Sequence, residues 1–404
     1  MIQHGIFTPL IAFLLCLPCS IQAQNETGGS GSSLQRIVRE IVKNNTQLKA
    51  FRQQANAQVL SNSAELRLPD PDVDIAYLFN TPNTANNRTN VSISQSLDWD
   101  VLTGRRKALA NIANTAVEKN YLLQTAQVMN EADEALIDVI YYNILCKELS
   151  QREAVSTDLL RLYTKKYDEG GATSIELNKL RLNVSVCKAA LNRARSGRSK
   201  ALGVLQVLNG GQPLVVNDTT YFFDNEKLPP LSKMLSECAN NSTITLAKAN
   251  ASVSQQAVSV AKLQKYPTLK VGFQGEYNKE EKYSGVSLGF SIPLWGNSRK
   301  RFKQTLVKAK ADQAEVLSTE EKFSTMVKLT YQQAEELLLT SQNLQTELME
   351  TDSGTLLRKA LDEGQMSLID FLLEQSFYNE ARSSLIDAQH EAQLSMAKLR
   401  GLLR

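Results

Sequence analysis

Residues 285–296 read GVSLGFSIPLWG, a stretch in which apolar side chains alternate with small or polar ones. Serine and glycine residues separate four apolar positions, which are Val286, Leu288, Phe290 and Ile292. This period of two predicts a β-strand with one apolar face. The segment that follows, 298–361, contains no proline and favours one long helix. The strand is therefore expected to belong to a mostly helical chain.

The chain is internally duplicated. Four segments recur in the same order: NNTQL at 44 and NNSTI at 240, PDVDIAY at 71 and PTLKVGF at 267, VSISQSL at 91 and VSLGFSI at 286, and DEGGATSIEL at 168 and DEGQMSLIDF at 362. Subtracting the paired positions gives offsets of 194 to 196 residues. Such a constant offset indicates two structural repeats, at 34–208 and 231–404, joined by a linker at 209–230.

Each repeat is expected to run helix–strand–strand–helix–helix, with the first helices at 33–66 and 231–263. The predicted strands are 72–79 and 90–98 in the first repeat, and 268–277 and 285–294 in the second. The long helices that follow, 105–167 and 298–361, would extend about 90 Å at 1.5 Å per residue. Gly170 and Gly364 are predicted to turn the chain into a returning helix. Residues in the returning helices recur at the three- and four-residue spacing of coiled coils, at Leu177, Leu180, Val184, Cys187 and Leu191, and, with one acidic interruption, at Phe371, Glu374, Tyr378, Ala381 and Leu385.

The N-terminus has the features of an export signal. Residues 1–23 combine an apolar run with small residues before a cleavage site after Ala23, and a flexible leader is expected at 24–33. An N-terminal membrane anchor is the alternative. Beyond this segment no run of about 18 apolar residues predicts a transmembrane helix. The three remaining cysteines, Cys146, Cys187 and Cys238, are an odd number at wide spacing and are expected to be small core residues.

The residue types argue against an enzyme. The net charge is only +3, without a strongly basic patch, so nucleic acid is not an expected partner. His390 is the one histidine outside the predicted signal peptide, which leaves no histidine-based triad or histidine–cysteine metal site. The NGG sequence at position 209 lacks the lysine of a phosphate loop. We therefore expect no catalytic residues, no metal and no cofactor.

All four predicted strands alternate in the same way, and their length suits a tilted membrane-spanning strand. An ordinary antiparallel sheet with one face in water is the alternative. The two tryptophans, Trp99 and Trp295, lie 196 positions apart, each near the end of a second strand, as expected of an aromatic girdle at a membrane interface. Basic clusters follow both, GRRK at 104 and SRKRFK at 298, and would contact lipid headgroups or water.

Strand edges cannot face lipid, so membrane strands must close into a barrel. Four strands are too few, because bacterial barrels begin at eight. The chain must therefore combine its strands with those of other copies. Two copies would give eight strands and a filled interior, whereas three would give twelve and room for a channel.

Over residues 34–404 the sequence resembles the TolC-type outer-membrane efflux proteins. The resemblance rests on the duplicated layout, on NN-x-x-L near the start, on SIPLW after the second strand pair, and on DEG-x-x-S-L-I-D-F before the last helix. It implies a mainly α fold that contributes to a trimeric 12-stranded β-barrel and an α-helical periplasmic tunnel. It also implies docking to a periplasmic adaptor and an inner-membrane efflux pump. The length is closest to the outer-membrane subunits of heavy-metal exporters.

The same resemblance suggests an acidic ring at the tunnel mouth. Asp370 matches an acidic position that rings the mouth in family members, with Glu374 nearby and Glu176 at the corresponding place in the first repeat. Family members often carry a second acidic residue one turn further on, where this chain has Leu373. They also often carry a basic residue two positions after the turn glycine, where this chain has Met366. The alternative function is a periplasmic coiled-coil adaptor or scaffold, although an adaptor would contain its helical hairpin once rather than twice.

Overall fold

The structure is a computed structural model that describes residues 30–79, 86–221, 228–350 and 353–404. The predicted signal peptide, 1–23, lies outside the described residues. Most of the predicted leader, 24–33, also lies outside them. Its last four residues were expected to be flexible, but they form the start of helix α1, which begins at Ser30.

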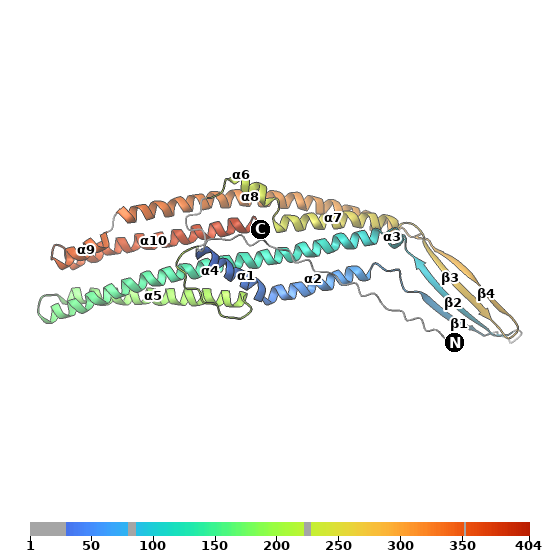
Figure 1. Ribbon diagram of the computed structural model, residues 1–404, viewed down its shortest axis with the longest axis horizontal. Helices are drawn as coiled ribbons and strands as arrows, with labels where there is room; N and C mark the ends of the chain where they lie inside the picture. Colours follow the sequence, from blue (N-terminus) through green and yellow to red (C-terminus); the bar gives the residue numbers. More distant parts are fainter. Residues whose placement is uncertain (1–29, 80–85, 222–227, 351–352) are drawn as a thin grey trace, which may run out of the picture.

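The molecule is elongated, with a small sheet at one end and two helical hairpin turns at the other (Figure 1). The described helices are α1 (Ser30–Asn44), α2 (Thr46–Ala64), α3 (Trp99–Leu102), α4 (Arg105–Asp168), α5 (Ser174–Leu208), α6 (Leu231–Cys238), α7 (Ser242–Leu263), α8 (Asn297–Glu350), α9 (Ser353–Asp362) and α10 (Leu368–Gly401). The described strands are β1 (Asp72–Leu78), β2 (Arg88–Leu97), β3 (Thr268–Tyr277) and β4 (Lys282–Ser291). The same series of elements therefore occurs twice along the chain, and the fold is mainly helical with one small antiparallel sheet.

The sheet joins the two repeats. Its strands are all antiparallel and follow the order β1-β2-β3-β4, so the central pair, β2 and β3, comes from different halves of the chain. In this pair Ile93 lies opposite Phe273, and Phe273 in turn lies opposite Val286 of β4. Strand β4 ends at Ser291, before the predicted end at 294, because Pro293 has no N–H to donate to a ladder.

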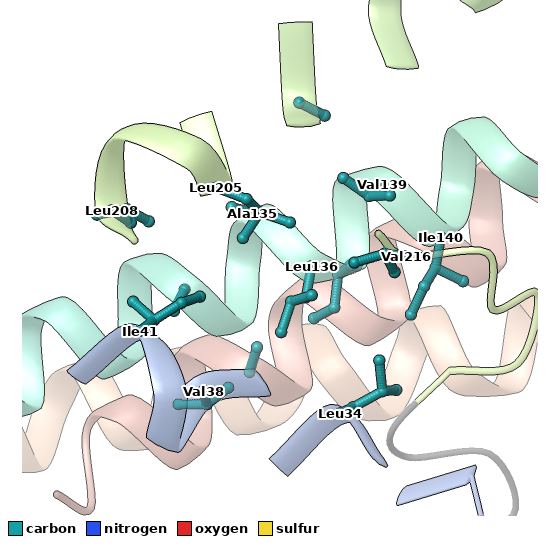
Figure 2. Close-up of a cluster of buried hydrophobic side chains, with 14 of the residues drawn as sticks. Leu34, Val38, Ile41, Ala135, Leu136, Val139, Ile140, Leu205, Leu208 and Val216 are labelled. Carbon is teal, nitrogen blue, oxygen red and sulfur yellow. The ribbon is translucent and has the colours of Figure 1, made fainter. Parts of the chain in front are cut away.

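The middle of the molecule holds the largest hydrophobic core. Helix α1 packs across α4 and the end of α5, as Figure 2 shows. Leu34 and Ile41 of α1 are fully buried there, together with Leu136 and Ile140 of α4. Leu205 of α5 completes the same cluster. This packing fixes the first helix against the long hairpin of its own repeat.

The first helix of each repeat is broken, contrary to the expectation of continuous helices at 33–66 and 231–263. Asn45 begins α2, and its side-chain oxygen accepts a hydrogen bond from the Leu48 amide at 2.8 Å. Asn241 does the same for the Thr243 amide, at 2.7 Å, at the start of α7. The paired asparagines that mark the duplication are therefore helix N-caps, a position that asparagine favours.

Helix α4 is continuous over 64 residues. The expected long helix at 298–361 is described as α8 up to Glu350 and α9 from Ser353, and residues 351–352 between them lie outside the described residues. Cys238 is buried, while Cys146 and Cys187 are partly buried, and all three are free thiols.

Candidate functional site

One face of the sheet is apolar across all four strands. The register places Ile75 opposite Val91, and Val271 opposite Leu288, on this face. On the outer strands this face is largely uncovered, since Ile75 is 73% exposed and Val286 is 77% exposed, whereas Val91 and Val271 on the central strands are partly buried. The alternation in each strand therefore produces one mainly apolar face, which Gln95 of β2 interrupts. Its apolar residues are Val73, Ile75, Tyr77, Val91, Ile93, Leu97, Leu269, Val271, Phe273, Tyr277, Val286, Leu288 and Phe290.

The opposite face is polar. It carries mostly serine, glycine and charged side chains, because Ser92, Ser94 and Ser96 alternate with the apolar residues of β2. Arg88 pairs with Glu276 at 2.5 Å, and Lys270 pairs with Asp72 at 3.2 Å. Both pairs connect strands of different repeats and are partly exposed, so each stabilises the fold by at most about 1 kcal/mol. A sheet that is apolar on one side and polar on the other suits a boundary between lipid and water.

The two tryptophans near the sheet have different surroundings. Trp99 begins helix α3 directly after β2, and its indole N–H donates to the Pro267 carbonyl at 2.7 Å. Trp295 follows β4 and is 89% exposed. The structure therefore places both at the junction between sheet and helices, but only Trp295 leaves most of its ring uncovered.

The hairpin turns lie at the far end of the long helices (Figure 1). Gly170 has φ +77° and Gly364 has φ +73°, a left-handed conformation that glycine adopts without strain. The next amides close the helix ends, from Gly171 to the Lys166 carbonyl at 2.7 Å and from Gln365 to the Ala360 carbonyl at 2.9 Å. The two glycines thus set the ends of the two hairpins.

The predicted acidic residues follow these turns. Asp370 and Glu176 occupy equivalent positions, each three residues after the N-cap of a returning helix. The Asp370 amide donates to the Ser367 hydroxyl oxygen at 3.1 Å, and that hydroxyl donates to the Asp370 carboxylate at 2.6 Å. Glu374 lies one turn further along α10 and is exposed. One chain therefore presents Asp370 and Glu374 on α10 and Glu176 on α5, and a ring would require further copies.

Glu176 forms a capping box with Thr173. The Thr173 amide donates to the Glu176 carboxylate at 2.7 Å, and the Glu176 amide donates to the Thr173 hydroxyl oxygen at 3.2 Å. The hydrogen bond from the Thr173 amide is the largest cause that lowers the pKa of Glu176, followed by that from the Thr173 hydroxyl. Since a lowered pKa favours the ionised form in the fold, this cap stabilises the turn at neutral pH.

We expect this cap to weaken in acid. The stabilisation is fully present above the unfolded pKa of a glutamate, near 4.5, and is lost as pH falls through the lower folded value. Thr173→Ala should destabilise the start of α5 by about 1 kcal/mol. Hydrogen exchange at 174–177, followed from pH 7 to pH 3, measures both effects. Glu176→Gln should reduce the acid dependence, whereas Glu374→Gln is the control; equal behaviour of the two variants would contradict the cap.

Sequence reasoning missed the cluster that joins the two hairpin tips. Phe371 and Leu368 of α10 pack with residues of the other hairpin, including Leu159 of α4 and Leu180 of α5. Phe371 is 2% exposed, and Leu159 and Leu180 are fully buried. Leu180 and Phe371 belong to the apolar stripes visible in the sequence, but the stripes do not reveal which residues lie opposite. We call this group the tip cluster; its buried members are Leu159, Tyr163, Leu180, Leu361, Leu368 and Phe371.

Polar contacts also connect α4 with α10, farther from the hairpin turns than the tip cluster. The Tyr141 hydroxyl donates to Asp387 at 2.8 Å, and His390 Nε2 lies 2.8 Å from Asp138 Oδ1. Burial, then the hydrogen bond to Asp387, raises the pKa of Tyr141. His390 is thus engaged in packing between helices. Among the described residues no group of three or more histidine, cysteine or acidic side chains could hold a metal ion.

No helix in the described part of the chain is both long enough and apolar enough to cross a membrane.

No protein-family model and no curated protein sequence matches the chain. Solved structures are similar over nearly its whole length. CusC, in a study of transmembrane channel formation, gives a TM-score of 0.77 at 14% identity and covers 94% of this chain and 95% of its own. The chain has the fold of the TolC-type outer-membrane channels. The CmeC outer membrane channel of Campylobacter jejuni gives 0.75 at 17% identity, covering 95% of this chain and 90% of its own.

The MtrE outer membrane channel of Neisseria gonorrhoeae, solved in its open state, gives a TM-score of 0.67 at 15% identity and covers 92% of this chain and 88% of its own. The resemblance found in the sequence is therefore confirmed at the level of the fold. Identities this low carry no information about individual residues.

Proposed function

We propose that the chain is one subunit of an outer-membrane exit duct, with its sheet in the outer membrane and its helices in the periplasm. The observation that carries the proposal is the sheet with one exposed apolar face and one polar face. In water, a face with nine exposed apolar side chains on four strands would be an aggregation hazard. In a bilayer the same face would stabilise the inserted protein, because the outer surface of a membrane barrel is apolar where it contacts lipid.

The subunit number follows from the strand count. Strands β1 and β4 are the two edges of the sheet, and each must pair with a neighbouring copy before it can face lipid. Three copies would close a 12-stranded barrel wide enough for a channel. The similar solved structures are outer-membrane channels, which supports this closure.

We further propose that the duct serves a tripartite system and conducts its cargo passively. The helical hairpins would extend the barrel as a tunnel, and their tips would dock to a periplasmic adaptor that links the duct to an inner-membrane pump. Trp99 and Trp295 would lie at the periplasmic surface of the outer membrane, as an aromatic girdle in contact with outer-membrane lipid. No cofactor and no catalytic residue enter this function.

A coiled-coil adaptor or scaffold is the competing function, and the sheet argues against it. A scaffold in the periplasm would gain nothing from a sheet whose apolar face is uncovered. Planar-bilayer recording separates the two functions. The purified protein should insert and give discrete steps of equal conductance, whereas a scaffold would give none.

Charge at the tunnel mouth can be tested in the same recordings. Three copies of Asp370 around one axis would favour cations, since rings of acidic side chains select for cations in channels. Asp370→Asn should weaken cation preference and block by divalent ions. Glu169→Gln, an exposed acid next to the other turn, is the matched control and should change little. Unchanged selectivity and divalent block in Asp370→Asn would mean that Asp370 serves only as a helix cap.

A further inference from the structure

The two junctions between sheet and helices handle charge differently. In the first repeat, Trp99 is flanked by Asp98 and Asp100, and both acids lie close to Arg106 of the basic cluster that follows. Arg106 pairs with Asp100 at 2.9 Å, and that carboxylate is only 2% exposed. Gln264 donates to the same carboxylate at 3.2 Å. The buried Asp100 carboxylate is thus satisfied by Arg106 and Gln264.

The second junction lacks these acids. At the same offset of 196, Leu294 replaces Asp98 and Gly296 replaces Asp100 on either side of Trp295. Arg299 and Arg301 are exposed, and neither forms an ion pair within the described part of the chain. Lys265 Nζ lies 3.9 Å from the centre of the Phe302 ring, a contact that leaves its charge unneutralised. Among the described residues, no acidic side chain pairs with the three cations of the second junction, Lys265, Arg299 and Arg301.

Two adjoining cavities lie between these cations. Lys265 and Arg299 line a cavity of about 390 Å³, and Arg301 lines a second of about 290 Å³. Pro293 and Ser298 line both, so the two cavities are neighbours. The larger one has room for roughly a dozen waters at ~30 Å³ each. A headgroup phosphate would fit in that space.

The rim of the cavities is apolar. Ile292 and Leu294 line the larger cavity and are 59% and 77% exposed, and Trp295, 89% exposed, lines the smaller one. This rim continues the apolar face of β4 beyond Phe290. A ligand here meets cations at one end and apolar side chains at the other, which is the chemistry of an acidic phospholipid.

We infer that the second junction binds an acidic phospholipid, with the headgroup phosphate between Lys265, Arg299 and Arg301 and the acyl chains along Ile292, Leu294 and Trp295. The inference rests on the proposed function, which places this junction at the inner boundary of the outer membrane. The first junction differs in that its acids Asp98 and Asp100 pair with Arg106, whereas the second has Leu294 and Gly296 at the corresponding positions. Each subunit would thus hold one such lipid.

The test uses the full chain purified in a mild detergent. Native mass spectrometry counts bound lipids during titration with phosphatidylglycerol and, separately, with phosphatidylcholine. We expect phosphatidylglycerol to bind about tenfold more tightly, and Arg299→Gln with Arg301→Gln to remove this preference. Lys300→Gln with Lys303→Gln removes the same charge from the same helix outside the cavities, and should leave the preference intact. If the arginine double variant does not assemble, Arg299→Gln alone should weaken phosphatidylglycerol binding about threefold.

Three results would overturn the inference: no preference in the unaltered chain, equal losses in the arginine and lysine variants, or displacement of phosphatidylglycerol by inorganic phosphate at matched concentration. The last would assign the cavities to a free anion. Channel recordings on the same preparations keep the proposed function separate. A conducting channel without lipid preference overturns the lipid site alone, whereas a protein that never conducts overturns the duct.

Discussion

Val286→Arg should abolish assembly of the protein in the outer membrane, while Ser287→Arg should reduce it only modestly. Val286 lies half-way along β4, is 77% exposed, and stands opposite Phe273 on the apolar face. An arginine facing lipid near the midplane costs about 2–4 kcal/mol. Three symmetry-related copies would carry that cost three times in one barrel, so the effect on assembly should be large.

Ser287 is the matched control because it is the next residue at nearly the same depth. It stands opposite Gly272 on the polar face, where an arginine would meet water. Heat-modifiable mobility of outer-membrane extracts measures the assembled fraction for both variants. If Val286→Arg and Ser287→Arg reduce assembly equally, the two faces are equivalent and the sheet does not border lipid.

Phe371→Ala should loosen the two hairpin tips from each other. Phe371 is 2% exposed in the tip cluster and contacts the buried residues of both hairpins. Removing a buried phenylalanine costs about 3–5 kcal/mol, because the cavity left behind is only partly refilled. Amide exchange over 157–163 and 357–371 should accelerate by about a hundredfold to a few thousandfold, since 1.4 kcal/mol corresponds to a factor of ten.

Phe377→Ala is the control for this prediction. Phe377 lies on the same helix but is 59% exposed, so its removal creates no cavity within the chain. We expect exchange at the tips to be unchanged in this variant. Equal acceleration in both variants would mean that the tip cluster does not hold the hairpins together.

The sheet was predictable because its information is local. A period of two fixes which face each residue of a strand occupies, and the apolar residues of Val91–Leu97 and Leu269–Phe273 meet on one face once the strands pair. Pairing of β2 with β3 follows less directly, since these strands are far apart in the sequence. The glycine turns were also local features, because left-handed φ values favour glycine.

The helix breaks and the tip cluster were not predictable in the same way. The Asn45 and Asn241 side chains cap new helices where apolar periodicity alone continues, so the capping residue decided the structure. The partners of Phe371 come from a hairpin about 200 positions away, a distance that no periodicity encodes. The acidic positions were visible in the sequence, but their capping roles became clear only from hydrogen bonds.

The subunit number tests the central claim most directly. Protein extracted from outer membranes after alkaline washing should have the mass of three chains by native mass spectrometry, with chemical cross-links that form a ladder ending at three. A stable monomer that retains its full β-structure in detergent would contradict the account, because a single four-stranded sheet cannot close its edges against lipid.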